Sequence, residues 1–324
     1  MPVRNGIPFL QECLDSIRNQ TYANWELHAV NDHSTDETQQ ILEQYAELDS
    51  RIKPTHNLGK GIIKALITGN NLSIGQYITR MDADDIMPPK KLATLYDLLA
   101  RQNLSALATG HVKYFSETGV KDGYKSYETW LNQLCVNNNH YQYIYKECAI
   151  ASPAWMMRRD YFEEIGGFES ETYPEDYDLC FRMYEHKVKI IPTNTIVHHW
   201  RDHGSRTSRT DENYADNRFL TLKLYYFHKI EVPKHDSFIL IGAGKKGKTV
   251  AKFLNLQEVP FTWATNNPKK IGIDIYDKTL KNYNEISFDH NHSAIIVSVA
   301  NKDEQTEIKN RLQNINLNRV YFLC

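Results

Sequence analysis

Apolar runs alternate with helix-like segments from residue 1 to about residue 130, in the strand-helix-strand order that predicts a parallel sheet. Residues 25–30 and residues 76–81 read as strands, and residues 35–48 between them read as a helix. Each of these strands ends where a cluster of polar residues begins. Because open α/β sheets bind ligands at the carboxyl ends of their strands, we expect the polar clusters to face one crevice.

The strand predicted at residues 1–6 is unusually short, since these residues already read as the end of a strand that enters a helix at residues 8–20. Several apolar residues of a buried strand are missing from it. We therefore expect the natural protein to start upstream of Met1, unless the sequence was trimmed. An intact mass of the native protein that matches a start at Met1 would refute this expectation.

A second α/β pattern follows a break in the chain. A helix predicted at residues 217–229 leads to the breaker Val232 to Lys234, and a new strand-helix pattern starts at Phe238. The sequence therefore predicts two domains, residues 1–232 and residues 233–324, of which the second is a small Rossmann-like unit. Its predicted strands are residues 238–241, 261–264, 293–299 and 319–323, and its predicted helices are residues 245–256 and 303–314.

Composition narrows the classes of function. The 324 residues suit two domains, and the net charge of −2 without a basic block argues against nucleic-acid binding. The five cysteines are scattered, which favours neither a disulfide framework nor a zinc site and is typical of a reducing cytoplasm. No apolar run reaches the roughly 18 residues of a membrane span, so we expect any membrane contact to be peripheral, at the inner face.

Three carboxylates crowd the segment from Arg80 to Asp85, directly after a predicted strand. Such a cluster repels itself unless a cation lies within it. Hard oxygen ligands suit Mg²⁺ or Mn²⁺, which can bridge the phosphates of a nucleotide. From these residues alone, a solvated acidic turn is the alternative.

The acidic segment and several others, in order along the chain, resemble family 2 glycosyltransferases of the GT-A fold. The resemblance covers residues 1 to about 210 and implies a nucleotide-sugar-binding domain with a mixed, mostly parallel sheet. The segments that carry it are Pro2–Gly6, Val30–Asp36, Asn57–Gly61 with Gly69 and Gly75, Arg80–Asp85, Ile165–Phe168, Glu175–Leu179 and Trp200–Ser205.

The resemblance implies roles on the donor side of the site. Asp32 would bind the uracil edge, Asp82 the ribose and Asp84 the metal, with Asp85 supporting the loop and His203 completing the coordination. The alternatives are a helix cap for Asp32 and a structural role for a lone histidine. Further donor contacts are expected from Pro2, Arg4, Asn5, Lys60 and Arg201, although Arg201 also reads as an ordinary surface arginine.

The resemblance also implies the catalytic pair. Asp176 would be the general base of an inverting transfer, and Glu175 would position the acceptor. The alternative is a charged helix start after Pro174. Gly166 and Gly167 would form a turn that approaches the sugar, or a plain turn between helix and loop.

Two departures from the family pattern concern the donor. Asn31 and His33 replace the first Asp and the Gly of the common Asp-Asp-Gly-Ser segment, which leaves the base of the donor open. UDP is favoured only by its frequency in the family. Trp155 lies where the acceptor side is often built and is either a platform for a sugar or a core residue.

The second domain carries a possible nucleotide loop at Gly242, Gly244 and Gly247, between a predicted strand and a predicted helix. Thr265 stands where a dinucleotide site usually has an acidic residue. Three alternatives stay open: a vestigial fold used for packing or for a homodimer, a sensor of nucleotides or sugar nucleotides, and an active dinucleotide site.

The sequence as a whole predicts an enzyme. We expect an inverting, Mn²⁺- or Mg²⁺-dependent hexosyltransferase that moves a sugar from a nucleotide-sugar donor to a hydroxyl of a glycan or lipid-linked acceptor, in cell-surface polysaccharide synthesis. The alternatives are a sugar-phosphate nucleotidyltransferase and an inactive nucleotide-binding scaffold.

Overall fold

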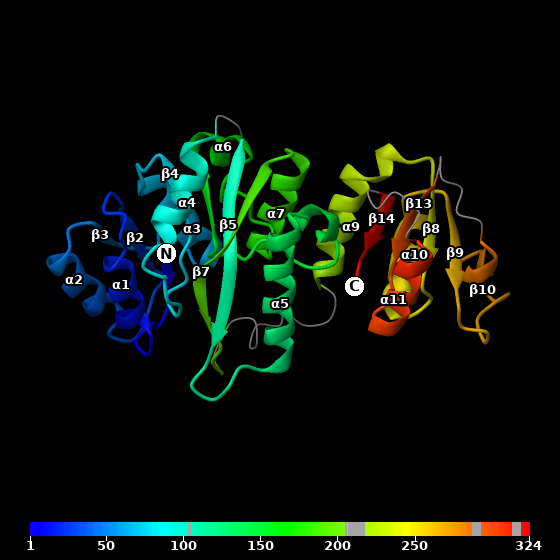
Figure 1. Ribbon diagram of the computed structural model, residues 1–324, viewed down its shortest axis with the longest axis horizontal. Coiled ribbons are helices and arrows are strands. Elements are labelled where there is room, and N and C mark those ends of the chain that lie inside the picture. Colours follow the sequence, from blue (N-terminus) through cyan, green and yellow to red (C-terminus); the bar gives the residue numbers. More distant parts are fainter. Residues whose placement is uncertain (103–104, 205, 207–217, 287–292, 313–318) are drawn as a thin grey trace. The chain divides into compact units, whose positions relative to one another are not determined.

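The computed structural model describes residues 1–102, 105–204, 206, 218–286, 293–312 and 319–324 and divides the chain into two compact units (Figure 1). The first unit comprises Met1–His140 and Ala149–Thr210, and the second comprises Tyr141–Cys148 and Asp211–Cys324.

The boundary expected between residues 232 and 233 differs from this division, because helix α9 (Arg218–Ile230) belongs to the second unit. The ring of Phe227 on α9 lies 5.4 Å from that of Phe238 and 5.2 Å from that of Tyr321, both in the second unit. These contacts join the helix to the core of that unit, although the helix precedes the breaker in the chain.

The described strands of the first unit form a three-stranded and a four-stranded sheet. The first sheet is parallel, in the order β1-β2-β3, and the second has the order β4-β6-β5-β7, in which only β6 is antiparallel to its neighbours. The predicted α/β architecture with a mixed, mostly parallel sheet is confirmed. The strands are β1 (Pro2–Val3), β2 (Leu27–Asn31), β3 (Ile52–His56), β4 (Tyr77–Thr79), β5 (Ala106–Phe115), β6 (Trp155–Arg158) and β7 (Lys189–Arg201).

The helices of the first unit form where apolar residues recur every three or four positions. In α1 (Leu10–Arg18) the buried residues Leu10, Cys13, Leu14 and Ile17 follow this spacing, which places them on one face. The other α-helices are α2 (Thr38–Leu48), α3 (Ile62–Leu72), α4 (Lys91–Ala100), α5 (Asp122–Asn137), α6 (Arg159–Glu164) and α7 (Glu175–Glu185).

The second unit contains a five-stranded parallel sheet in the order β12-β9-β8-β13-β14. In chain order this is the third, second, first, fourth and fifth strand, the arrangement of doubly wound nucleotide-binding sheets. Its main elements are β8 (Ser237–Ile241), α10 (Lys245–Leu256), β9 (Phe261–Thr265), β12 (Lys281–Asn282), β13 (Ser293–Val297), α11 (Lys302–Arg311) and β14 (Val320–Phe322), with a hairpin of β10 (Asp274–Ile275) and β11 (Lys278–Thr279).

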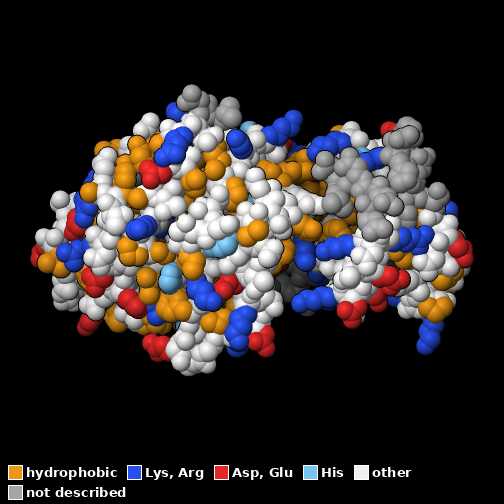
Figure 2. Space-filling model, in the orientation of Figure 1, with side chains coloured by type: hydrophobic (Ala, Val, Ile, Leu, Met, Phe, Trp, Pro, Cys, Tyr) orange, Lys and Arg blue, Asp and Glu red, His pale blue; other side chains and the backbone are white. Residues whose placement is uncertain are grey.

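The surface of the first unit carries mixed charge. Acidic and basic side chains are both spread over the face shown in Figure 2, in accord with the net charge of −2. Among the described helices, none combines the length and the apolar character that crossing a bilayer requires.

Candidate functional site

Arg80 connects the end of β4 to the start of α7. Its buried guanidinium donates from Nε to Oδ1 of Asp82 at 3.0 Å and from Nη1 to Oε1 of Glu175 at 2.8 Å. Burial opposes its charge, but Asp82 and Glu175 outweigh burial and raise the pKa of Arg80 above its ordinary value. One cation therefore holds together a carboxylate two residues after it and another 95 residues further along the chain, at the start of α7.

Asp84 and His203 lie next to each other although they are 119 residues apart in the chain. Nε2 of His203 lies 2.8 Å from Oδ2 of Asp84, and its ring packs 4.7 Å from that of Phe9. Burial tends to raise the pKa of Asp84, but the contact with His203 and the charge of Arg206 lower it below its ordinary value. The predicted metal ligands thus lie side by side, with the carboxylate favoured in its ionised form.

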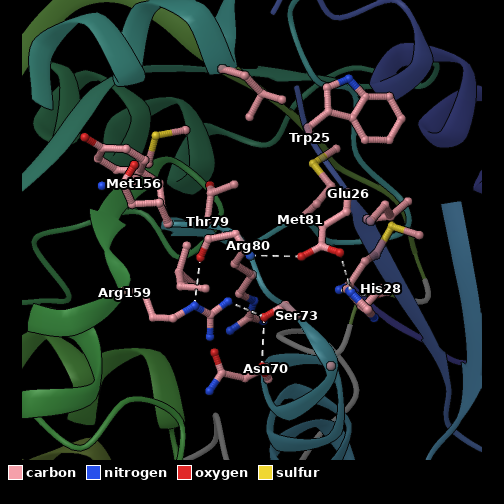
Figure 3. Close-up of a pocket in the computed structure, with 18 of the residues that line it drawn as sticks. Trp25, Glu26, His28, Asn70, Ser73, Thr79, Arg80, Met81, Met156 and Arg159 are labelled. Carbon is pink, nitrogen blue, oxygen red and sulfur yellow. Dashed lines mark hydrogen bonds and ion pairs between the residues drawn. The ribbon is translucent and has the colours of Figure 1, made fainter. Parts of the chain in front are cut away.

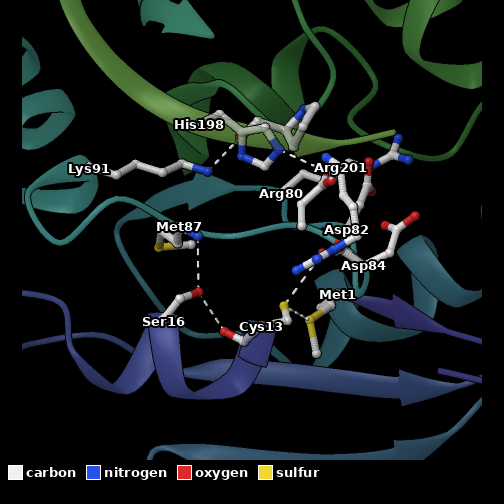
Figure 4. Close-up of polar contacts among 12 residues, drawn as sticks. Met1, Cys13, Ser16, Arg80, Asp82, Asp84, Met87, Lys91, His198 and Arg201 are labelled. Atoms are coloured by element: carbon white, nitrogen blue, oxygen red, sulfur yellow. Dashed lines mark hydrogen bonds and ion pairs between the residues drawn. The ribbon is translucent and has the colours of Figure 1, made fainter. Parts of the chain in front are cut away.

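Figure 4 shows Asp82 and Asp84 of the acidic segment near His198 and Arg201 of β7, and Asp85 joins these two parts of the chain. Its Oδ2 lies 2.8 Å from Nε2 of His198, and its Oδ1 accepts from the backbone N–H of Arg201 at 2.7 Å. Both side chains are buried, and burial raises the pKa of Asp85 and lowers the pKa of His198. The pair supports the loop that presents Asp84.

Arg201, which the sequence offers as a donor contact or a surface arginine, lies against the acidic segment. Its Nε donates to the backbone oxygen of Asp84 at 2.8 Å, and its terminal nitrogen pairs with Glu12. The guanidinium lies 4.6 Å from the ring of Phe9 and 4.5 Å from that of Phe115. Because only 7% of this side chain is exposed, Arg201 holds the acidic loop in place, and its expected contact with the donor stays a prediction.

Asp32 fixes the loop that follows β3. Both of its carboxylate oxygens accept from the backbone N–H of Gly61 at 3.0 Å, and Oδ1 also accepts from Nδ2 of Asn57 at 2.7 Å. Lys60 is exposed beside this contact. Asp32 is 5% exposed, so its carboxylate organises the loop at the carboxyl end of the sheet.

The residues that depart from the family pattern have local reasons. Asn31 accepts from the backbone N–H of Ser34 at 3.0 Å and donates to Gln39 at 2.9 Å, which an ionised aspartate could not do. His33 has a φ of 55°, where glycine is usual, and its Nε2 lies 2.7 Å from the backbone oxygen of Gly59. That contact offsets part of the backbone strain.

The loop after β1 is tied to the loop after β2. Asn5 donates its backbone N–H to Oγ of Ser34 at 2.9 Å, and its Oδ1 accepts from the backbone N–H of Thr35 at 2.9 Å. Pro2 lies in β1, and Arg4 is exposed next to it. These predicted donor residues therefore lie at the same end of the sheet as Asp32.

Asp176 occupies the first turn of α7 next to Glu175. Burial and the charge of Glu175 raise its pKa to about 7, while Arg80 acts in the opposite direction. Its Oδ1 accepts from the backbone N–H of Tyr177 at 2.8 Å. Glu175 is 8% exposed and bound to Arg80, so it holds the guanidinium of Arg80 in place, and its expected role in positioning the acceptor stays a prediction.

The turn at Gly166 and Gly167 is held by Arg182. The two glycines have φ values of 84° and 47°, and Arg182 donates to the backbone oxygens of Ile165 at 2.7 Å and Gly167 at 2.9 Å. Asp178 accepts from Nε of Arg182 at 2.9 Å. The turn is therefore braced from α7, the helix that carries Asp176.

Trp155 is a core residue. It is 2% exposed, and its ring lies 5.7 Å from that of Phe162 and 6.4 Å from that of Phe168. This position removes it as a platform for a sugar.

Several residues that matter to the site were not assigned from sequence. Arg80 stands two residues before the first carboxylate of the acidic segment, and a charged residue at the end of an apolar strand is a signal that it has buried partners. His198 has no comparable signal. The guanidinium of Arg206 lies 5.1 Å from the ring of Trp200 and 5.4 Å from that of Tyr124. Its positive charge helps to lower the pKa of Asp84.

The glycine loop of the second unit borders a cavity of about 430 Å³. Gly242 has a φ of 111°, and a Cβ on Gly247 would lie 2.1 Å from the backbone oxygen of Gly242. Lys270 donates to the backbone oxygen of Ala243 at 2.7 Å, and Thr265 borders the same cavity. The close approach of helix and loop explains Gly247, and the positive φ explains Gly242. The ligand of the loop stays a prediction.

Comparison with known proteins identifies the family. The model of glycosyl transferase family 2 matches residues 1–166, which is more than half of the chain. The chain therefore belongs to glycosyltransferase family 2.

Particular relatives agree with this assignment. Glycosyltransferase GlyA of Streptococcus pneumoniae is 29% identical over 64% of this chain and 31% of its own length. An uncharacterized glycosyltransferase of Haemophilus influenzae is 28% identical over 70% of this chain and 73% of its own length. The chain thus spans about one third of GlyA.

Solved structures show the same fold. S. aureus TarS 1–349 in complex with UDP-GlcNAc has a TM-score of 0.54 and 16% identity, over 78% of this chain and 70% of that one. The mannosyltransferase PcManGT of Pyrobaculum calidifontis in complex with GDP-Man and Mn²⁺ has a TM-score of 0.50 and 19% identity, over 70% and 61%. The first unit accordingly has the GT-A type of fold.

Proposed function

We propose that the chain is an inverting glycosyltransferase that transfers a sugar from a nucleotide-sugar donor to an acceptor hydroxyl. The observation that carries the proposal is the Arg80 network, which joins Asp82 of the acidic segment to Glu175, the immediate neighbour of Asp176. A donor held at the acidic segment and a base at the start of α7 would then share one site.

Asp84 and His203 suit a divalent metal. Among the described residues no group of three or more possible ligands gathers, so the protein would supply these two and the donor phosphates and water the rest. When bound, Mn²⁺ or Mg²⁺ would neutralise charge that develops on the leaving diphosphate. Asp85 and Arg201 would keep Asp84 in position through the contacts described above.

Asp176 would act as the general base. As the acceptor oxygen bonds to the anomeric carbon, the bond from that carbon to the diphosphate breaks and the hydroxyl proton passes to the Asp176 carboxylate. Attack from the side opposite the leaving group inverts the anomeric centre. A pKa of about 7 suits a base that accepts this proton near neutrality.

The donor would lie over the carboxyl ends of β1, β2 and β4. Asp32 would face the base and Asp82 the ribose, with further contacts from Pro2, Arg4, Asn5 and Lys60. UDP is the favoured nucleotide, supported by the UDP-GlcNAc complex of TarS, and PcManGT with GDP-Man supplies the competing choice.

The acceptor side completes the proposal. We place the enzyme in the cytoplasm, with peripheral attachment to the inner face of the membrane, acting on a glycan or lipid-linked acceptor in cell-surface polysaccharide synthesis. A homodimer formed through the second unit would be compatible with this role.

The substitution Asp176→Asn tests the proposal. It should leave thermal stabilisation by the donor and Mn²⁺ intact while transfer falls by several orders of magnitude. Asp122→Asn is the matched control, because Asp122 has a side chain that is 98% exposed on α5. Retained transfer by the Asp176 variant would exclude it as the base, and absent donor binding by the unmodified chain would favour an inactive scaffold. Nucleotidyl transfer to a sugar phosphate would favour the other alternative.

A further inference from the structure

The first unit contains a cavity of about 570 Å³ between β2 and β4 (Figure 3). Two charged side chains of its lining have partners within the protein. Oε2 of Glu26 lies 3.1 Å from Nε2 of His28, and Nη2 of Arg159 donates to Oγ of Ser73 at 2.7 Å. These charges are therefore satisfied by protein groups and require no ligand.

The cavity of the second unit, of about 430 Å³, has a different electrostatic character. It lies at the carboxyl ends of β8, β9 and β13, whose following loops border it. In the sheet order the chain grows outward in opposite directions from β8 and from β13, and doubly wound sheets bind their ligands at such a position. Among the described residues of the lining there are three lysines, Lys245, Lys246 and Lys270, and one carboxylate, that of Glu304. The excess of positive charge suits an anion.

The two helices that start at this cavity differ in what they offer to an anion. Gly244 is the N-cap residue of α10 and has no side chain to accept from the first N–H groups of the helix, and the first turn holds Lys245 and Lys246 without an acidic residue. A Cβ on Gly244 would meet no atom within 4 Å, so there is space above the loop. At α11, Oδ1 of Asn301 already accepts from the backbone N–H of Glu304 at 3.0 Å. A phosphate is therefore favoured at the start of α10.

Lys270 brings a cation to the same place from the loop after β9. Its Nζ donates to the backbone oxygen of Ala243 in the glycine loop at 2.7 Å. A phosphate bound beside α10 would add an ionised acceptor within reach of this ammonium group. Hydrogen bonds between ionised groups are roughly twice as strong as those between neutral groups.

Thr265, at the end of β9, has the position in which dinucleotide sites usually hold a carboxylate for the ribose hydroxyl. Its side chain is 4% exposed, and its Oγ1 accepts from the backbone N–H of Asn267 at 3.2 Å. Within the part of the chain that the structure describes, no group accepts from its O–H. A buried donor without an acceptor is costly, so the cavity needs a ligand acceptor at this point.

We propose that the second unit binds a dinucleotide whose ribose carries a 2′-phosphate. The diphosphate lies over Gly244 at the start of α10, and the ribose phosphate accepts from the hydroxyl of Thr265 and pairs with Lys270. A free ribose hydroxyl at this position meets a donor and a cation instead of an acceptor, so the unphosphorylated dinucleotide binds less tightly. The site involves only residues of the second unit and is independent of the proposed sugar transfer.

Isothermal titration of the full chain with NADP⁺ and with NAD⁺ tests the proposal. NADP⁺ should bind at least about tenfold more tightly, because only it carries the second anionic group. Equal affinities, tighter binding of NAD⁺, or no binding of NADP⁺ would overturn the proposal.

Substitutions at the ribose position sharpen the test. Thr265→Asp should reverse the preference in favour of NAD⁺, because a carboxylate accepts from the free hydroxyl and repels the phosphate. Lys270→Met, at a less buried position, should reduce the preference for NADP⁺ at least about fivefold. Lys252→Met is the matched control, since Lys252 is exposed on α10 and does not border the cavity, and it should leave both affinities unchanged. A Lys270→Met variant that keeps the full preference would exclude Lys270 as the partner of the ribose phosphate.

Hydrogen exchange locates the bound dinucleotide. Saturating NADP⁺ should slow exchange of the amides from Gly244 to Gly247 at least about tenfold, also in the Asp176→Asn variant, whose substitution lies in the first unit. Protection confined to the first unit would overturn the proposal. Stronger protection of these amides by UDP than by NADP⁺ would do the same.

Discussion

Replacing Arg80 by methionine tests the network that connects the acidic segment to Asp176. The substitution keeps an unbranched apolar stem and removes the guanidinium with its charge, so Glu175 is left buried without its cation. Removing one partner of a buried ion pair costs about 3–5 kcal/mol, and the partial exposure of Asp82, at 24%, favours the lower figure. For a domain of this size, about 3 kcal/mol corresponds to a fall of about 10 °C in the unfolding midpoint.

The same substitution should change the pH dependence of transfer. Arg80 lowers the pKa of Asp176, so its removal raises that pKa above about 7 and moves the rising limb of activity to higher pH. Circular dichroism on heating and a pH profile of kcat measure the two effects. Arg80→Lys should recover part of both, because it retains the charge but loses the two-armed geometry.

Arg158→Met is the matched control. Arg158 forms a solvent-exposed pair with Asp160, and such pairs contribute little to stability. The control should leave the midpoint and the pH limb unchanged. If Arg80→Met behaves like the control in both measurements, the network does not organise the site and the link between donor and base loses its support.

The remaining predictions concern the base, the metal and the second unit. Transfer should rise with pH through about 7 as Asp176 ionises, and a kcat profile that is flat from pH 5 to about 9 would contradict this role. Because the pKa of Asp176 is raised, the folded state binds more protons than the unfolded state between about pH 4 and about pH 7. The contribution of Asp176 to the free energy of unfolding should therefore fall as pH rises through this range. Urea unfolding of Asp176→Asn and of the unmodified chain at several pH values measures the effect. Chelation with EDTA should abolish transfer, and added Mn²⁺ should restore it. The His203→Ala variant should need an about 10–100-fold higher Mn²⁺ concentration for half-maximal activity, and an unchanged concentration would exclude His203 as a ligand. Gly247→Ala should destabilise the second unit by about 1–3 kcal/mol, because its Cβ would meet the backbone oxygen of Gly242. Gly244→Ala should not, because a Cβ there has no atom within 4 Å. Equal unfolding midpoints of the two variants would contradict the close contact at Gly247. Thermal shift with NAD, UDP and a UDP-sugar separates the alternatives for the glycine loop, since a ligand that binds the folded unit raises its midpoint.

The sequence predicted the elements where one periodicity runs without interruption. Residues 245–256 were predicted as a helix and form α10 with the same bounds, because its buried positions recur at helical spacing between a glycine and a polar end. The strand predicted at residues 76–81 is shorter in the structure, where β4 ends at Thr79. Arg80 leaves the strand to bind Asp82 and Glu175, and apolar patterning carries no information about such partners.

The family was determined by short segments whose residue types and order survive in the sequence itself. Asp84 and His203 were assigned together from such segments, and the structure places them 2.8 Å apart. Which side chains are buried against partners, and which stay exposed, was decided only by the tertiary structure. The sequence left Arg201 as either a donor contact or a surface arginine, and the structure encloses it between two aromatic rings and the backbone oxygen of Asp84.

Tertiary structure alone paired His198 with Asp85, assigned α9 to the second unit and left a cavity between β2 and β4. Hydrophobic periodicity reports whether a position is buried, and a motif reports the chemistry that a residue can perform. Neither reports which residues more than a hundred positions away complete a contact. That choice is made when the strands and helices pack, because buried charges and strand edges must then find the partners that the rest of the fold brings to them.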